Sequence, residues 1–580
     1  MKKVLKELKP YYLLIVLSTV FIFVQVILNL YLPNLMSDII NNGIVGQSMD
    51  NVWSYGEKML IVTLIAMVFT ISASFIAAKV SSSFARRLRK SVYEKVQTFS
   101  LEEYNKISTS SLITRTTNDV TQVQNLTLMA MRMMVQAPLM CIGGIIMAVS
   151  KNVQLSFVFL VIIPLLLLLI ALVAKKVVPM FTKLQNFTDR LNQVVREKLT
   201  GVRVIRAFGT QKYEANRYDT ASKDIYEVNL KVSYIISILM PLIFFVINIS
   251  SVIIIWFGAG LIDAGSLQIG DMMAFMQYAI QVLFSILMLT MMFVMIPRAI
   301  VSAKRINEVL EIEPVIVDNE KEISKDEITN PGEIEFENVE FKYNESDEPV
   351  LMDLNFKIKK GQTVAIIGST GAGKTTMLNL MLRFYDATKG NIKVGGINVK
   401  DMSLESLRSM IGFVPQKVNL FSGTIAENIK YGKQDATEEE IIEAAKIAQS
   451  YEFIASQENG FDSVVSQGGT NFSGGQKQRI SIARALIKKA DIYLFDDSFS
   501  ALDYNTDKKL REALKNDVKG STVIIVAQRV STILKADNII FIDEGKILAQ
   551  GTHKELYKNC EEYREIVLSQ ISKEEAMLNE

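Results

Sequence analysis

The sequence predicts an α-helical membrane domain with six spans and long helical extensions, followed by an α/β domain built around a phosphate-binding loop. Hydrophobic residues make up 49% of the 580 positions and the mean hydropathy is +0.24, which is too apolar for an ordinary soluble protein. Long apolar stretches fill the first half. In the second half, an apolar strand-like run leads into a glycine-rich loop and then into a helical run, which is the setting that a phosphate-binding loop requires.

Each of six apolar stretches approaches the roughly 20 residues that a helix needs to cross a bilayer. They cover residues 12–32, 59–80, 126–149, 155–174, 233–261 and 272–296. Lysine and arginine are frequent before the first span, between the second and third, and between the fourth and fifth, whereas residues 33–56 and 262–271 contain neither. By the positive-inside rule, we expect a multi-pass protein of the cell membrane with both termini and the α/β domain in the cytoplasm.

The long inner connections, residues 79–125 and 175–232, have helical patterns and few breakers, so we expect the spans to continue into the cytosol. The chain must reverse along each connection. We expect this near 108–115 and 208–214, which are either exposed turns or docking segments. An acidic, polar stretch with Pro314 and Pro331 marks the domain boundary. The predicted organisation is a membrane domain (1–310), a linker (311–333), the α/β domain (334–572) and a C-terminal tail (573–580).

The glycine-rich loop matches the pattern G-x-x-x-x-G-K-[ST] residue by residue, as Gly368, Ser369, Thr370, Gly371, Ala372, Gly373, Lys374 and Thr375. In such a loop the backbone amides close around phosphates, the lysine reaches the β- and γ-phosphates, and the hydroxyl of Thr375 ligates Mg²⁺. A second apolar run, 491–496, ends at Asp496, which suits the role of holding Mg²⁺ directly or through water.

Residues 471–479, Asn-Phe-Ser-Gly-Gly-Gln-Lys-Gln-Arg, resemble the ABC-transporter signature. With this motif, the chain from Lys2 to about Gln570 resembles a half-transporter of the ABC exporter type, and in layout the bacterial heterodimeric multidrug exporters. Tyr343 fits the aromatic residue that stacks on adenine, Gln416 fits the Q-loop, and residues 500–503, Ser-Ala-Leu-Asp, fit the D-loop.

The resemblance implies a domain-swapped ABC exporter fold in which two nucleotide domains close head to tail, so that each ATP lies between one P-loop and the opposite signature. ATP on this chain would contact the P-loop, Thr376, Tyr343, Gln416 and Asp496, with Mg²⁺ held by Thr375, Gln416 and Asp496. The ATP of the partner subunit would contact the signature side of this chain, comprising Phe472, Ser473, Gly474, Gly475, Gln476 and Asp503. The helix that starts near Gly475 can present its amides to a phosphate, with Ser473 as its cap.

Two positions depart from the family pattern. The resemblance implies a glutamate after Asp496 and a histidine after the last core strand, but Asp497 and Gln528 occupy these places, and the one histidine of the chain is His553. Aspartate keeps the charge but is one methylene shorter, and glutamine donates hydrogen bonds but cannot become cationic. A positioned general base contributes about 10²–10⁴-fold to a rate. One transition-state donor contributes on the order of 10²–10³-fold.

The sequence therefore predicts a subunit of a heterodimeric ATP-driven exporter, with slow turnover at its own site and hydrolysis mainly at the site completed by its signature. The partner would be a second half-transporter carrying the glutamate and histidine, and the cargo an amphiphilic drug-like compound or a lipid. Alternatives are harmless variation in a homodimeric lipid or drug exporter, and a regulatory ATP-sensing membrane subunit. The net charge of +2 without an aromatic-interleaved basic patch does not indicate nucleic-acid binding.

Several residues of the spans admit two interpretations. A series of methionines in the last span suits either a cavity for varied apolar cargo or ordinary helix packing. Arg132 could bind anionic cargo, although snorkelling or an interhelical pair is favoured. Gln25 and Asn29 are polar residues of the kind that bridge helices. The methionines are Met272, Met273, Met276, Met288, Met291, Met292 and Met295, with Phe284 and Phe293 between them.

Overall fold

The computed structural model describes residues 2–318, 327–343 and 348–577. The chain divides into two compact units, which are considered separately below. The first contains Met1–Gln97 and Ile107–Ile312, and the second contains Thr98–Lys106 and Glu313–Glu580. The short segment Thr98–Lys106 therefore belongs with the C-terminal unit, although it lies between two membrane helices in the sequence.

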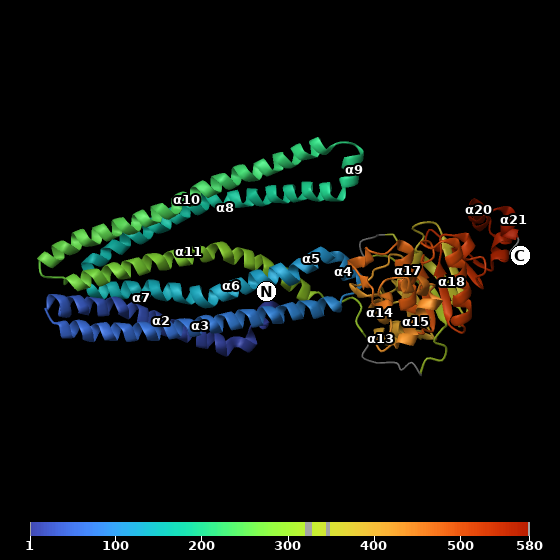
Figure 1. The fold of residues 1–580 in the computed structure, drawn as a ribbon, viewed down its shortest axis with the longest axis horizontal. Helices are drawn as coiled ribbons and strands as arrows, with labels where there is room; N and C mark the ends of the chain where they lie inside the picture. The colour runs from blue at the N-terminus through green and yellow to red at the C-terminus, as the bar shows by residue number, and fades with distance from the viewer. Residues whose placement is uncertain (1, 319–326, 344–347, 578–580) are drawn as a thin grey trace. The chain divides into compact units, whose positions relative to one another are not determined.

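Six helices of the first unit are long and apolar enough to cross a membrane, which confirms the six predicted spans (Figure 1). The α-helices are α1 (Lys2–Lys6), α2 (Tyr12–Asp38), α3 (Met49–Gln97), α5 (Thr109–Thr114), α6 (Val120–Met129), α7 (Val135–Lys151), α8 (Val153–Thr200), α9 (Val202–Ala207), α10 (Gln211–Asp263) and α11 (Ile269–Glu311). The π-helical segments are Ile39–Val45, Arg115–Asp119 and Ala130–Met134.

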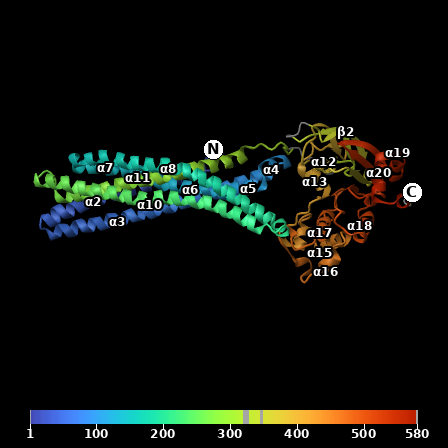
Figure 2. The same cartoon turned by 90° about the horizontal axis from the view of Figure 1, so that it is seen from above.

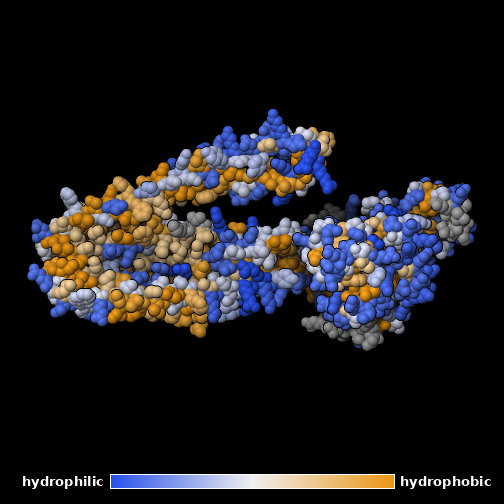
Figure 3. Space-filling view, viewed as in Figure 1, coloured by the Kyte–Doolittle hydropathy of each residue, from blue (hydrophilic) through white to orange (hydrophobic). Residues whose placement is uncertain are grey.

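The membrane helices form two groups. Helices α2, α3, α6, α7 and α11 form one group of contacting helices, whereas α8 packs most extensively against α10. Figure 1 shows the α8 and α10 pair diverging from the other helices toward α9. Figure 3 shows hydrophobic residues covering the part of this unit far from α9, with hydrophilic residues more frequent toward α9. This gradient is what a helix bundle needs if its apolar part lies in lipid and its extensions lie in water.

The first chain reversal begins earlier than the sequence predicts. Helix α3 ends at Gln97 and a short helix, α4 (Leu101–Ile107), follows. The carboxylate of Glu103 accepts a hydrogen bond of 2.7 Å from the amide of Ser100, so α4 starts with a satisfied amide. Residues 109–114 are already helical, after Ser108 with φ of +65°. The second reversal lies where expected, at Phe208-Gly209-Thr210 between α9 and α10.

Two larger sheets form the frame of the second unit. The six-stranded sheet has the order β12-β11-β3-β10-β9-β6, parallel except for β12, and the four-stranded antiparallel sheet has the order β2-β1-β4-β5. The first comprises β3 (Thr363–Gly368), β6 (Ile411–Val414), β9 (Ile492–Asp496), β10 (Thr522–Val526), β11 (Asn538–Asp543) and β12 (Lys546–Gly551). The second comprises β1 (Ile334–Phe341), β2 (Leu351–Ile358), β4 (Lys389–Val394) and β5 (Ile397–Asn398). Strands β9 and β10 are buried throughout, as expected for central parallel strands.

Helices cover these sheets, and Figure 2 shows α12 and α13 apart from α15, α16 and α17. They are α12 (Lys374–Met381), α13 (Leu404–Ser409), α14 (Ile425–Lys430), α15 (Glu438–Ile447), α16 (Tyr451–Ala455), α17 (Gly474–Leu486), α18 (Tyr504–Asp517), α19 (His553–Asn559), α20 (Glu561–Gln570) and α21 (Lys573–Met577). A two-stranded sheet joins β7 (Gly423–Thr424) to β8 (Val464–Val465).

His553 is a core residue. Its Nδ1 lies 2.8 Å from the hydroxyl of Tyr563, and its Nε2 lies 3.3 Å from the carbonyl of Ala576 in α21. Both His553 and Ala576 are buried. The ring of His553 therefore joins α19 to α20 and α21, and both of its nitrogens contact groups within the core.

Candidate nucleotide site

The phosphate-binding loop connects β3 to α12, and its shape depends on glycine. Gly371 and Gly373 adopt φ of +90° and +97°, a region that other residues rarely enter. A Cβ at Gly368 would lie 1.8 Å from the carbonyl oxygen of Ile542, and one at Gly373 would lie 2.4 Å from a methyl of Leu351. The close packing places the start of α12 at the loop, where its free amides and positive dipole end favour an anion.

Lys374, at the start of α12, is almost fully buried. Its Nζ donates hydrogen bonds to the carbonyl oxygens of Gly368 at 2.9 Å and Ser369 at 2.6 Å. Burial lowers the pKa of the ammonium, while the carboxylates of Asp497, Asp496 and Asp543 act in the opposite direction. A nucleotide phosphate carries full negative charge and is therefore a stronger partner for this ammonium than two neutral carbonyls.

Asp496 and Thr375 bring two oxygen atoms together beside Lys374. The Thr375 hydroxyl donates to Asp496 Oδ1 at 3.1 Å. Burial raises the pKa of Asp496, the hydrogen bond from Thr375 lowers it, and the neighbouring charge of Asp497 raises it further. A hydroxyl and a carboxylate are hard ligands that suit Mg²⁺. Within the described ranges, no three His, Cys, Asp or Glu residues form a metal-binding group.

Asp497, Gln528 and Gln416 converge at the ends of three neighbouring strands. Asp497 Oδ2 accepts hydrogen bonds from Gln528 Nε2 at 3.0 Å and from Gln416 Nε2 at 3.4 Å. Residues 414, 496 and 526 end β6, β9 and β10, which run parallel and adjacent, so the residues that follow them meet at one edge. Asp497 and Gln528 are therefore hydrogen-bonded to each other, and Asp497 adopts a left-handed conformation with φ of +46°.

Two contacts at this site could not be expected from the motifs. Gln570, in α20, donates to the carbonyl oxygen of Gln528 at 3.0 Å and accepts from the amide of Val530 at 2.8 Å, so it holds the backbone on both sides of position 529. The hydroxyl of Ser369 donates to Asp543 at the end of β11. Neither Gln570 nor Asp543 lies in a recognisable motif, and only the packing of α20 and β11 places them here.

Tyr343 is held on edge beside the phosphate loop. Its hydroxyl lies 3.1 Å from the hydroxyl of Thr376, and its ring packs edge-on against Phe341 and Tyr385, with centroid separations of 4.9 and 5.3 Å. These contacts fix the ring plane through two aromatic neighbours and one hydrogen bond. A ring fixed in this way loses little entropy when it packs against a further group.

The signature forms the first turn of α17. Ser473 and Gln476 make a capping box, in which Gln476 N donates to Ser473 Oγ at 3.3 Å and Ser473 N donates to Gln476 Oε1 at 2.9 Å. Ser473 and Gly474 are exposed, whereas Phe472 is buried in the core. A Cβ at Gly475 would lie 3.1 Å from the Ala501 carbonyl oxygen of the D-loop.

The signature and the phosphate loop are not bonded to each other in this chain. Among the hydrogen bonds of the described residues, none joins residues 472–476 to residues 368–376. Asp503, at the end of the D-loop, caps α18 by accepting from Thr506 N at 3.0 Å, and this hydrogen bond lowers the pKa of Asp503. Ser473 and Asp503 therefore cap the starts of α17 and α18.

The residues singled out in the spans divide between packing and exposure. Met272 and Met276 pack against the helix-bundle core and Met292 is buried, which agrees with ordinary packing for these three. The side chains of Met291 and Phe293 lie outside the described ones. Arg132 is exposed in the π-helical segment Ala130–Met134, and no ion pair found within the described part of the chain includes it.

Comparison with known proteins identifies the family. The family model of the ABC transporter transmembrane region matches residues 15–307, and that of the ABC transporter domain matches residues 351–500. The ABC transporter ATP-binding protein YfiB of Bacillus subtilis strain 168 is 40% identical over 574 residues, covering 99% of each chain. An ATP-dependent lipid A-core flippase of Syntrophus aciditrophicus is 34% identical over 493 residues, covering 85% of this chain and 81% of the flippase.

Two further comparisons support the same placement. The probable multidrug resistance ABC transporter ATP-binding/permease protein YheI of Bacillus subtilis strain 168 is 34% identical over 484 residues, covering 82% of this chain and 81% of YheI. A solved structure of a bacterial Atm1-family ABC exporter with ATP bound superimposes with a TM-score of 0.79 at 23% identity, covering 98% of both chains, which shows the shared fold. The chain therefore belongs to the ABC transporter family, as a multi-pass exporter polypeptide that joins a transmembrane region to an ATP-hydrolysing domain.

Proposed function

We propose that this chain is one half of a heterodimeric ABC exporter. Its own P-loop site binds ATP with Mg²⁺ and turns it over slowly, and its signature completes the fast site of a partner half-transporter. The observation that carries the proposal is the environment of Asp497, whose Oδ2 already accepts hydrogen bonds from two glutamine amides.

A general base must offer an oxygen to the attacking water at about 2.6–3.2 Å. Asp497 is poorly suited to this task because it is one methylene shorter than glutamate and because Gln528 and Gln416 both donate to Oδ2. Two hydrogen bonds occupy both lone pairs of Oδ2, so this oxygen has none left for the attacking water. The same two bonds orient the side chain toward the glutamines.

Gln528 gives a second reason for slow hydrolysis at this site. An imidazole can become cationic and stabilise the charge that develops on the γ-phosphate, whereas a neutral amide supplies at most a hydrogen bond. In this structure that amide donates to Asp497, so position 528 serves the base rather than the phosphate. Loss of one transition-state donor is worth on the order of 10²–10³-fold in rate.

Binding of the nucleotide does not require either residue. The glycine loop, Lys374 and the adjacent oxygens of Thr375 and Asp496 supply the phosphate and Mg²⁺ ligands, with Gln416 as a further candidate ligand. Mg²⁺, when bound, neutralises phosphate charge. ATP held at such a site favours the closed arrangement of two nucleotide domains without needing to be consumed in each cycle.

For the cargo, we propose amphiphilic or drug-like molecules, lipids among them, moved out of the cytoplasm or the inner leaflet. Two relatives that are 34% identical support this class, since one is named a lipid A-core flippase and the other a probable multidrug resistance transporter. The lysine and arginine distribution supports a cell-membrane location with both termini in the cytoplasm.

The test compares the ATPase activity of three purified preparations in lipid nanodiscs. These are the chain alone, the chain with its partner half-transporter, and the pair whose partner has its catalytic glutamate changed to glutamine. We expect activity only in the intact pair, with losses of about 10²-fold or more in the other two. The chain alone carrying Lys374→Ala measures the background. Brisk turnover by the chain alone, abolished by Lys374→Ala, would establish a homodimeric exporter instead.

A second measurement separates a pump from a sensor. Vesicles that contain the pair are loaded with ATP and a fluorescent amphiphile, and movement of the dye is followed. An exporter moves dye in proportion to ATP consumed, and the movement stops when the partner's catalytic glutamate is removed. ATP-dependent conformational change without movement of dye or labelled lipid would indicate a regulatory subunit.

A further inference from the structure

We infer that the linker segment 315–318 is a strap that mechanically connects the phosphate-binding helix α12 to α4, with Arg383 and Arg408 as positioning residues. Every contact in the argument lies within the second unit. Helix α4 is continuous in sequence with the membrane helices on both sides, so a connection to α4 is a connection to the transmembrane region. The inference does not depend on the heterodimeric assignment, because it concerns contacts within one chain.

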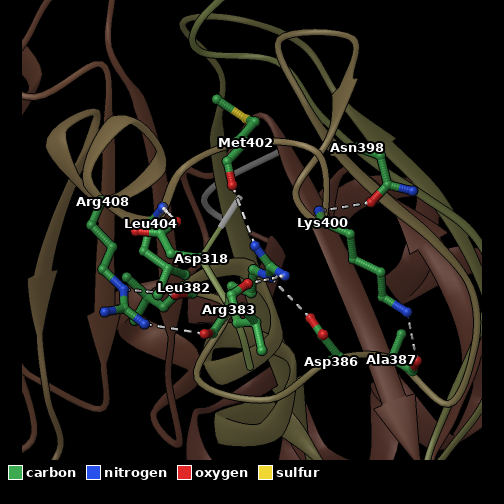
Figure 4. A network of polar contacts seen from close by, with 11 residues as sticks. Asp318, Leu382, Arg383, Asp386, Ala387, Asn398, Lys400, Met402, Leu404 and Arg408 are labelled. Atoms are coloured by element: carbon green, nitrogen blue, oxygen red, sulfur yellow. Dashed lines mark hydrogen bonds and ion pairs between the residues drawn. The ribbon is translucent and has the colours of Figure 1, made fainter. Parts of the chain in front are cut away.

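The first link lies at the C-terminal end of α12. Arg408, from α13, donates through Nε to the carbonyl oxygen of Leu382 at 3.2 Å and through its terminal nitrogen to that of Arg383 at 3.1 Å (Figure 4). The last carbonyls of a helix have no partner within the helix and carry its negative dipole end, so a guanidinium suits this place. One end of α12 binds phosphate and the other end is held by an arginine.

The second link is Arg383, which is buried with only 5% of its surface exposed and has a left-handed φ of +50°. Its guanidinium reaches three segments, donating to Asp386 Oδ1 at 3.1 Å, to the Met402 carbonyl at 3.3 Å and to the Val317 carbonyl at 3.4 Å. Figure 4 shows it between Asp386 and Met402. A buried guanidinium needs all of these partners, so its position fixes the strap against the residues that follow α12.

The third link joins the strap to α13. Asp318 Oδ1 accepts from Leu404 N at 2.8 Å, at the N-terminal end of α13, where a negative charge is favoured (Figure 4). Helix α13 leads directly into β6 and then into Gln416, which contacts Asp497. Lys488, just beyond the signature helix, donates to the carbonyl oxygens of Arg408 and of Ile411, the latter at 2.9 Å. The strap therefore lies on a hub that α12 and α17 share.

The fourth link connects the strap to α4. Val315 N donates to Glu103 Oε1 at 2.9 Å, and Glu103 is 6% exposed. Burial favours the neutral acid, but the hydrogen bonds from Ser100 and Val315 outweigh it, so the net pKa of Glu103 is lowered and the side chain is ionised at neutral pH. A second contact holds the same helix, since Asn105 Nδ2 donates to the hydroxyl of Tyr385 at 3.3 Å.

These links form one continuous series of charge-assisted and main-chain hydrogen bonds. In the inferred coupling, phosphate displaces the start of α12, Arg383 passes the displacement to the strap at Val317, and the amide of Leu404 in α13 holds the strap at Asp318. The strap then carries it through Val315 to Glu103 and α4. Because energetic coupling is carried by contiguous networks of this kind, breaking either end of the strap should uncouple transport from ATP turnover without weakening nucleotide binding.

The experiment uses the transporter in its active assembly, reconstituted in vesicles, with Glu103→Ala, Asp318→Ala and the double variant in this chain. Three quantities are measured: dye moved per ATP hydrolysed, basal ATPase rate and the Kd of a fluorescent ATP analogue. Each single variant should lower transport per ATP about tenfold, which is the usual effect of losing one charge-assisted hydrogen bond, with the Kd and basal rate within about twofold. The matched control is Glu405→Ala, an exposed acid in the first turn of α13, which should leave all three unchanged.

The double variant decides whether the two residues act through one strap. Residues in a single series are strongly coupled, so the double variant should lose no more than about twofold beyond the worse single variant. If the loss of transport per ATP in the double variant equals the product of the two single losses, the inference is overturned, because the two residues then act independently. Normal transport per ATP, or a loss matched by an equal rise in Kd, would also overturn it. If Glu103→Ala does not accumulate in the membrane, Glu103→Gln, which keeps the shape and loses the charge, should lower transport per ATP about threefold.

Discussion

The chain carries two halves of nucleotide machinery, and they differ in what they keep. On the phosphate-loop side, the residues proposed to bind phosphate and Mg²⁺ are present, but Asp497 and Gln528, hydrogen-bonded to each other, hold the positions where the family resemblance implies glutamate and histidine. On the signature side, Ser473 and Gln476 form a complete capping box, and Ser473 and Gly474 are exposed. Under the proposed function, ATP binding, ATP hydrolysis and assistance to a second site are separable tasks, because different side chains carry them.

The largest expected effect comes from the signature side. Gly474→Asp introduces a Cβ into open space within this chain, so the fold should survive, but its carboxylate would face the phosphate of the partner's site. We expect the ATPase rate of the intact pair to fall by about 10²–10³-fold. Lys374→Ala, on the phosphate-loop side, should lower the same ATPase rate only several-fold, which is the effect of weakening a single contact.

The control for this comparison is Gly474→Ala, which adds the Cβ without the charge and should lower the ATPase rate of the pair far less than Gly474→Asp does. Equal losses from Gly474→Asp and Lys374→Ala would show that both sites hydrolyse ATP, and the contrast between the halves would fail.

A smaller effect is expected from repairing the phosphate-loop side. Asp497→Glu combined with Gln528→His should raise the turnover of this site by about tenfold to a hundredfold, measured in a pair whose partner lacks its catalytic glutamate. The gain of the double variant should exceed the product of the single gains, because residues 497 and 528 are bonded and therefore coupled. Asp537→Glu, a matched change at the start of β3 where Asp537 accepts from Thr363 N at 2.8 Å, should have no effect.

The smallest expected effect is a difference in acid response between Asp496 and Asp503. Burial raises the folded-state pKa of Asp496, so its ionised form lowers the free energy of unfolding at neutral pH, and this penalty disappears as pH falls through the folded pKa. The hydrogen bond from Thr506 lowers the pKa of Asp503, so its stabilisation is present above the unfolded pKa and is lost as pH falls through the folded value.

Thermal melting of the nucleotide-free transporter measures both aspartates. At neutral pH, Asp496→Asn should raise the Tm and Asp503→Ala should lower it, and both differences should shrink as the pH is lowered toward about 4. In excess Mg²⁺ and ATP, Asp496→Asn should instead lower the Tm, because the ionised carboxylate of the unchanged protein then gains the metal as a partner. A Tm that falls in Asp496→Asn without nucleotide would contradict the assignment of a burial penalty.

The conformation of the glycine loop was predictable because it depends mainly on residues that are neighbours in sequence. A glycine loop between a strand and a helix, as in residues 368–375, specifies its phosphate-binding geometry through local φ values and backbone amides. The six spans followed equally well from the length and polarity of each stretch. The position of the first reversal did not follow, because the hydrogen bonds of Glu103, with Ser100 and Val315, determine where α4 lies.

The sequence alone determined the fold class, the family, the order of the motifs and the identity of the two unusual residues, since these are properties of composition and local pattern. Only the tertiary structure decided that Gln528 donates to Asp497, that Gln570 holds the backbone around position 528, and that Glu103 meets Val315 across 212 positions of the sequence. The physical reason is that these contacts depend on strand order and helix docking, which are set by packing of the whole unit rather than by neighbouring residues.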